Sequence, residues 1–277
     1  MSETQFHSFF DDAATFPPGL VPLDVAVREH IRRAADEVTD VFIGPLILPL
    51  DKVRDAATLA VGQPLDLSVV VPEGGLVDVE ELLSEISVTA TTVSGLEVKV
   101  GSDAAEGIAE AAKFAAEHPD LIIFIELPYD AVADENLSAL EAGGLALKFR
   151  TGGIRQELFP TSEQVVDVLS KAVDRGLPFK LTAGLHRAMR YTDGKTGFRH
   201  FGFANIAAAT AALRDGATPE QACAVLDTDD TGRIAATLEG APRWRDNFTS
   251  FGTCSVAEPA ETLAAIGLLT ADTAARF

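Results

Sequence analysis

The chain is short of positive charge. Among its 277 residues, 22 are Lys or Arg and 42 are Asp or Glu, which leaves a formal charge of −20. A nucleic-acid partner is therefore not expected, because binding to phosphates needs a basic surface. No apolar run approaches the roughly 18 residues of a transmembrane helix, so we expect no membrane partner.

Cysteine and metal-binding patterns are also scarce. The two cysteines, Cys223 and Cys254, are few for a disulfide framework and fit a reducing compartment. The N-terminus lacks a basic segment followed by an apolar one, so no signal peptide is predicted and a cytoplasmic location is expected. No His-x-His or His-Glu-x-x-His spacing is present, so we predict neither a metal site nor a cofactor.

What the sequence does contain is a repeated strand-to-helix pattern. Eight such units, most of them roughly 25 to 35 residues apart, predict an α/β protein with a single (β/α)8 TIM-type barrel over residues 1–277. Residues 87–100 suggest two short strands, so the barrel is expected to be irregular near its fourth strand. A doubly wound sheet is the alternative. The barrel is favoured because polar residues end nearly every predicted strand. These strands span residues 6–12, 41–48, 65–71, either 88–93 or 96–100, 121–127, 145–150, 179–184 and 248–254.

Three of these strands carry charged residues within apolar alternation. Lys148 and Lys180 alternate with apolar neighbours, as does Glu126 on the strand before them. Side chains on a strand point alternately to opposite faces, so the three charges are predicted to share one face of the sheet. Lysine in a buried parallel sheet is unfavourable unless it is paired or functional. A second cation and burial both favour the neutral amine that a Schiff base needs.

Other candidates follow the strands, where a barrel builds its site. Asp12, chosen over Asp11, and His186 are predicted to transfer protons together with Glu126. The 19-residue connection after the seventh strand, 185–203, is a candidate lid because it is rich in arginine. An anion clamp is predicted at the strand ends, from glycines that admit an oxyanion and from polar side chains that bind it. The predicted substrate-binding residues are Arg150, Thr151, Gly152, Gly153, Thr182, Ser250, Gly252 and His200.

Two segments resemble class I aldolases of the deoxyribose-phosphate type. Residues 147–155, LKFRTGGIR, resemble that family's Lys-x-Ser-Gly-Gly-Ile-Arg segment with one extra residue before the glycines. Residues 179–184, FKLTAG, resemble its Lys-Thr-Ser-Thr-Gly segment, which holds the Schiff-base lysine. The two segments occur here in the reverse order. The resemblance implies a barrel with paired lysines.

The whole chain also resembles an uncharacterised group of bacterial barrel-like proteins. The resemblance lies in five short segments and supports a shared site without indicating a reaction. These segments are 11–13 with 16–18, 148–153, 180–186, 200–203 and 250–254.

Three functions are compatible with these patterns. The first is an aldolase-like lyase that forms an imine between Lys148 or Lys180 and a small anionic carbonyl metabolite. The second is enolase-like proton abstraction at a carbon next to a carboxylate, either metal-free or metal-assisted. One lysine would be the base, and Asp12, Glu73 and Glu126 would bind Mg²⁺. The third is a non-catalytic barrel that binds an anionic metabolite. The oligomeric state is left open, with a homo-oligomer as one option.

Overall fold

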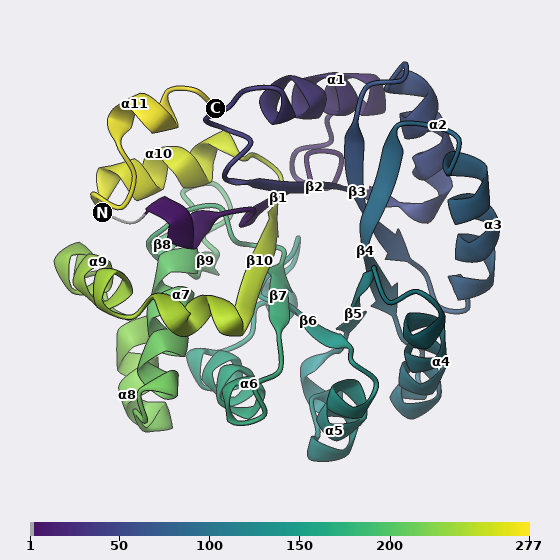
Figure 1. The fold of residues 1–277 in the computed structure, drawn as a ribbon. Coiled ribbons are helices and arrows are strands. Elements are labelled where there is room, and N and C mark those ends of the chain that lie inside the picture. The colour runs from purple at the N-terminus through teal and green to yellow at the C-terminus, as the bar shows by residue number, and fades with distance from the viewer. Residues whose placement is uncertain (1–2) are drawn as a thin grey trace.

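Eight parallel strands close into a barrel in the computed structural model, which describes residues 3–277. Around the ring the order is β1, β10, β7, β6, β5, β4, β3 and β2, and every neighbouring pair is parallel. Figure 1 shows these strands as a ring with the helices outside it. The predicted (β/α)8 barrel is confirmed. Its strands are β1 (Phe10–Asp12), β2 (Ile43–Pro49), β3 (Leu65–Val71), β4 (Thr91–Lys99), β5 (Ile122–Glu126), β6 (Ala146–Arg150), β7 (Phe179–Thr182) and β10 (Phe248–Thr253).

The helices bury one apolar stripe each against the outside of the ring. In α6, for example, Val165, Val166 and Leu169 are buried, as their spacing predicts. Capping boxes at Thr161 and Thr218 begin α6 and α8. The helices are α1 (Leu23–Ala34), α2 (Val53–Leu59), α3 (Leu76–Ile86), α4 (Ala104–Glu117), α5 (Asp134–Ala142), α6 (Ser162–Asp174), α7 (Phe203–Arg214), α8 (Pro219–Leu226), α9 (Thr231–Gly240), α10 (Ala257–Ala265) and α11 (Ala271–Ala274). No helix in residues 3–277 is long and apolar enough to cross a membrane.

The fourth strand differs from its prediction. Residues 91–99 form one continuous strand, β4, and not two short ones. Its pairing with β3 shifts register between Leu67 and Ser68, which is the irregularity that the sequence suggested. Such a shift adds one residue to one strand and breaks the alternation on which a strand prediction depends.

The long connection after β7 contains a small hairpin. Strands β8 (Tyr191–Thr192) and β9 (Arg199–His200) pair antiparallel. Arg199 forms an ion pair of 2.9 Å with Asp227, which also accepts a hydrogen bond from Ser162 at the start of α6. The hairpin is thus fixed to the helices beside β7.

Candidate active site

Lys148 and Lys180 lie side by side inside the barrel. Lys148 pairs in register with Lys180 across β6 and β7, and with Glu126 across β5 and β6. The Nζ atom of Lys148 lies 2.6 Å from a carboxylate oxygen of Glu126. Only 3% of Lys148 and 1% of Lys180 is exposed. The prediction that Glu126 and the two lysines share one inward face is confirmed.

Glu97 on β4 joins the two lysines and was not among the predicted residues. Its carboxylate lies 2.8 Å from Lys148 Nζ and 2.6 Å from Lys180 Nζ, and it accepts a hydrogen bond of 2.9 Å from Ser68. The signal was in the sequence, because Glu97 alternates with Leu96 and Val98 just as Lys148 alternates with its apolar neighbours. Residues 87–100 nevertheless predict two short strands, because the irregular stretch before Glu97 interrupts the alternation along β4.

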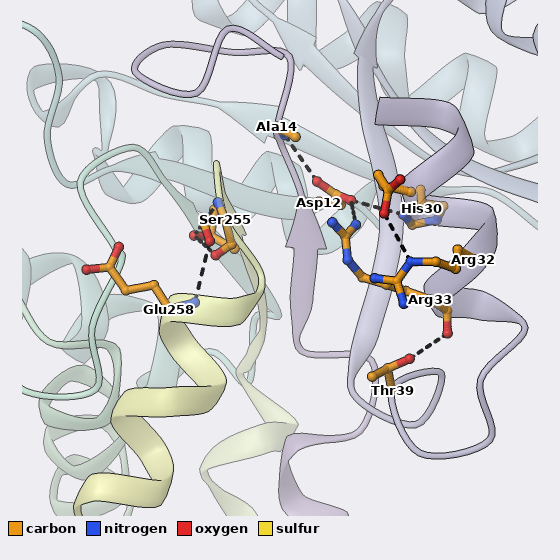
Figure 2. A network of polar contacts seen from close by, with 10 residues as sticks. Asp12, Ala14, His30, Arg32, Arg33, Thr39, Ser255 and Glu258 are labelled. Carbon is orange, nitrogen blue, oxygen red and sulfur yellow. Dashed lines mark hydrogen bonds and ion pairs between the residues drawn. The ribbon is translucent and has the colours of Figure 1, made fainter. Parts of the chain in front are cut away.

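Asp11 completes the cluster, so the choice of Asp12 was wrong. Lys180 Nζ donates to Asp11 at 2.6 Å, and Ser250 Oγ donates to the same oxygen at 2.7 Å. Asp12 points the other way, toward α1, where Arg33 donates to it at 2.9 Å and His30 lies 3.3 Å from it (Figure 2). Because β1 has only three residues, all of them buried, hydrophobicity did not reveal which aspartate faces inward.

Gly44 on β2 leaves the space that Asp11 occupies. A methyl group on Gly44 would lie 1.9 Å from Asp11 Oδ1, far inside van der Waals contact. We expect Gly44→Ala to displace Asp11 from Lys180 and to lower the free energy of unfolding by about 1–3 kcal/mol. Urea unfolding measures this change. Gly240→Ala is the control, because a methyl group there meets nothing within 4 Å. Equal stability of the two variants would contradict the inward position of Asp11.

The pKa values show which groups hold their charge. Burial alone would lower the pKa of Lys180, but Asp11 and Glu97 outweigh it and raise the pKa above its ordinary value. Burial acts to raise the pKa of Glu97, yet the two ammonium groups prevail and lower it. For Asp11 burial is the largest effect, and the pKa is raised despite Lys180. Within this cluster Glu97 therefore stays ionised, and Asp11 takes up a proton more readily.

A cavity of about 370 Å³ opens beside the cluster at the carboxyl ends of β5 and β6. Glu126 and Arg150 line it, and Arg150 lies 3.6 Å from Glu126. Burial on its own raises the pKa of Glu126, but Lys148, followed by Arg150 and Lys99, lowers it below its ordinary value. Neither Lys148 nor Lys180 is part of the lining, but Glu126, which contacts Lys148, is.

The glycine turn after β6 is not an open anion clamp. A methyl group on Gly152 would meet the ring of Phe159 at 2.9 Å and Gly184 Cα at 3.0 Å, and one on Gly153 would meet Leu158 at 2.4 Å. The Thr151 hydroxyl donates to the Ala183 carbonyl at 2.8 Å. These glycines therefore serve close packing between the turns that follow β6 and β7, whereas Arg150 of the predicted clamp lines the cavity.

The remaining predicted residues are spread over the ends of β7 and β10. Thr182 and Gly252 face each other, because a methyl group on Gly252 would lie 3.5 Å from Thr182 Oγ1. His200 bonds to the Gly184 carbonyl through Nδ1 at 2.9 Å. His186 Nδ1 lies 3.6 Å from the thiol of Cys254, and burial lowers the pKa of this histidine. Proton transfer by His186 stays a prediction.

The carboxylates of the Mg²⁺ alternative are not brought together. Asp12 faces α1, whereas Glu126 lies against Lys148, and Glu73 lies beside Gly101. Within residues 3–277, no group of three or more His, Cys, Asp or Glu side chains is arranged to hold a metal ion.

Comparison with known proteins supports the fold. No protein-family model matches the chain, and no curated protein matches its sequence. Among solved structures, it is similar to "QR15, an Aldolase", with a TM-score of 0.53 and 15% identity over 94% of this chain and 96% of that one. A Flavobacterium johnsoniae chitobiase gives a TM-score of 0.36 and 8% identity over 98% of this chain and 52% of that one, which supports no inference. The chain thus shares the barrel fold of that structure.

Proposed function

We propose that this barrel is a carbon–carbon lyase that forms an imine between Lys148 and a small anionic carbonyl compound. The observation that carries the proposal is Glu97, which lies within 2.8 Å of both lysine Nζ atoms inside the closed ring. A structural ion pair needs one lysine and one carboxylate. Two adjacent lysines that share a buried carboxylate beside a cavity provide one amine for reaction and one fixed positive charge.

Lys148 is the better nucleophile of the two. Lys180 is held by Asp11 and Glu97 at 2.6 Å each, and its raised pKa keeps it an ammonium group. Lys148 also has two carboxylate partners, Glu97 at 2.8 Å and Glu126 at 2.6 Å, but Glu126 lines the cavity. The role of Lys180 is then to remain charged next to the reacting nitrogen.

Glu126 is positioned to carry the protons of such a reaction. It would take a proton from the Lys148 ammonium group, and the neutral amine would then add to the substrate carbonyl carbon. Glu126 would return that proton to the carbonyl oxygen, giving a hydroxyl group. It would then carry a second proton from the nitrogen to this hydroxyl group, which leaves as water and gives the iminium ion. Cleavage of the neighbouring carbon–carbon bond would place its electron pair on the iminium as an enamine, while Glu126 accepts the proton of the β-hydroxyl group. Protonation of the enamine and addition of water would then release the second product.

Borohydride trapping tests this proposal. Wild-type protein is incubated with a panel of keto acids and sugar phosphates, reduced with sodium borohydride and analysed by peptide mass spectrometry. We expect a covalent adduct on Lys148 that is missing in Lys148→Arg. The absence of any adduct on Lys148 or Lys180 with the whole panel would refute the imine mechanism.

A non-catalytic anion-binding barrel is the second candidate. It is favoured by the carboxylates around the lysines, since Asp11, Glu97 and Glu126 hold both amines in ion pairs. Binding of an acid from the panel without adduct or turnover would support this candidate in place of the lyase.

A further inference from the structure

The geometry points to a 2-oxo acid as the substrate class, with the carboxylate next to the reacting carbonyl bound by Lys99 and Arg150. This inference rests on the proposed function, because it takes Lys148 as the amine that meets the carbonyl. It concerns the cavity at the ends of β5 and β6, which both cations line.

The strand register sets these two cations around the reacting lysine. Lys99 pairs with Glu126 across β4 and β5, and Glu126 pairs with Lys148 across β5 and β6. Arg150 follows Lys148 by two residues, so both face inward, roughly 6.6 Å apart along the strand. A substrate whose carbonyl carbon reaches Lys148 would therefore bring a carboxylate on the adjacent carbon toward Arg150.

Both cations are available to a ligand. Arg150 is exposed and lies 3.6 Å from Glu126, which in turn contacts Lys148 at 2.6 Å. Lys99 is also exposed and forms no ion pair within 4 Å among the described residues. The only other acidic side chain in the cavity lining is Glu157, which is exposed to water. A planar carboxylate suits the two-pronged guanidinium group of Arg150.

The cavity lacks the features that usually bind a phosphate group in barrels. Such sites use backbone N–H groups of glycine turns and of helix N-termini. Here Phe159, Gly184 and Leu158 pack against the turn at Gly152 and Gly153. The start of α6 is capped by its own Thr161 and Gln164 side chains. A methyl group on Gly252 would lie 3.1 Å from Ile47 Cδ1, so Gly252 packs closely against Ile47. The side-chain cations are the anion-binding groups that remain.

Apart from Glu157 and Gln164, the rest of the cavity lining is mainly apolar, and the cavity is small. The rings of Tyr129 and Phe159 and the side chains of Leu127, Pro128 and Pro160 line it. Its volume of about 370 Å³ lies at the lower end of the ~300–1,000 Å³ range of ligand pockets. A short acid with an apolar chain fits this lining better than a polyhydroxylated sugar.

Binding of such an acid would also act on Glu126. Lys99 and Arg150 help to lower the pKa of Glu126, although burial opposes them. A substrate carboxylate would engage these cations and add a negative charge near Glu126, and both changes favour its protonation. Glu126 lies 2.6 Å from Lys148 Nζ, so it is placed to accept the proton that imine formation removes from that nitrogen.

The test uses acids that cannot form an imine. Isothermal titration calorimetry compares phenyllactate, its amide and glycerol 3-phosphate on the wild-type protein. We expect phenyllactate to bind roughly 10- to 100-fold more tightly than the amide, as for a charge-assisted hydrogen bond. This preference should be lost in Lys99→Gln and Arg150→Gln. The preference should persist in Arg155→Gln. This control removes an exposed arginine from the segment that follows β6, outside the cavity lining.

Two results would overturn the inference: equal binding of the acid and its amide, or tighter binding of glycerol 3-phosphate. Because phenyllactate has no carbonyl group to react, this outcome is independent of the borohydride result. A protein that prefers carboxylates but traps no carbonyl compound would retain this ligand class and lose the lyase mechanism. A protein that traps carbonyl compounds without a preference for carboxylates would retain the lyase mechanism and lose this ligand class.

Discussion

Replacing Glu97 with Gln should destabilise the barrel by about 3–5 kcal/mol, the range for removing one partner of a buried ion pair. Glu97 is 1% exposed and contacts both lysine Nζ atoms and the Ser68 hydroxyl. Glutamine keeps the size of the side chain but directs an amide N–H group at an ammonium group. Urea unfolding at pH 7 measures the loss, and Glu85→Gln, at an exposed ion pair with Arg54, serves as the control and should change little.

The loss of unfolding free energy in Glu97→Gln relative to the wild type should become smaller as the pH rises to about 9. In the wild type, the stability contributed by the raised pKa of Lys180 is present below its ordinary value of 10.5 and is lost above it. Without Glu97, Lys180 keeps only Asp11 as a partner, so its pKa falls. The folded variant then releases protons before the unfolded chain does, and its stability relative to the wild type rises with pH. A deficit that stays constant from pH 7 to pH 9 would argue against a shared charge.

Replacing Lys180 with Met should destabilise the barrel by a similar amount, about 3–5 kcal/mol, because it removes the cation and leaves buried carboxylates unpaired. The apolar side chain fits the space but leaves Asp11 with only the Ser250 hydroxyl as a hydrogen-bond partner. The pKa of Asp11 is already above its ordinary value of 3.8 and would rise further. The folded variant then binds more protons than the unfolded chain, so its stability falls as the pH rises through the folded pKa.

The wild type should show the opposite slope in acid. The lowered pKa of Glu97 contributes stability that is present above its ordinary value of 4.5 and is lost as the pH falls below it. The difference in unfolding free energy between Lys180→Met and the wild type should therefore become smaller as the pH falls from 7 to about 4. The double variant Asp11→Asn/Lys180→Met should recover part of the loss, because it removes the unpaired charge. A double variant that is less stable than Lys180→Met would count against this explanation.

The inward position of the lysines could be predicted because their strands alternate. In residues 145–150 and 179–184 the lysines lie on the face opposite the large apolar residues. The register places Glu126, Lys148 and Lys180 side by side. The eight-stranded barrel could be predicted for a related reason, since strand and helix periods alternate along most of the chain.

Glu97 and Asp11 could not be identified in the same way. The register shift between β3 and β4 interrupts the alternation just before Glu97. In β1, three residues are too few to show a period, and the pairing with β2 also shifts between Phe10 and Asp12. The anion clamp failed for another reason: a glycine pair is equally compatible with an open turn and with close packing, and only the positions of Leu158 and Phe159 distinguish the two.

One carboxylate that serves two amines also constrains how this protein can evolve. No single substitution at position 97, 148 or 180 leaves the others in balance, so natural variants should accumulate changes there together and seldom one at a time. An alignment of homologues should show correlated substitutions at these positions, and substitutions at position 11 should accompany those at position 180. Homologues that lose one lysine yet retain all the acidic partners would indicate that selection does not act on this balance of charge.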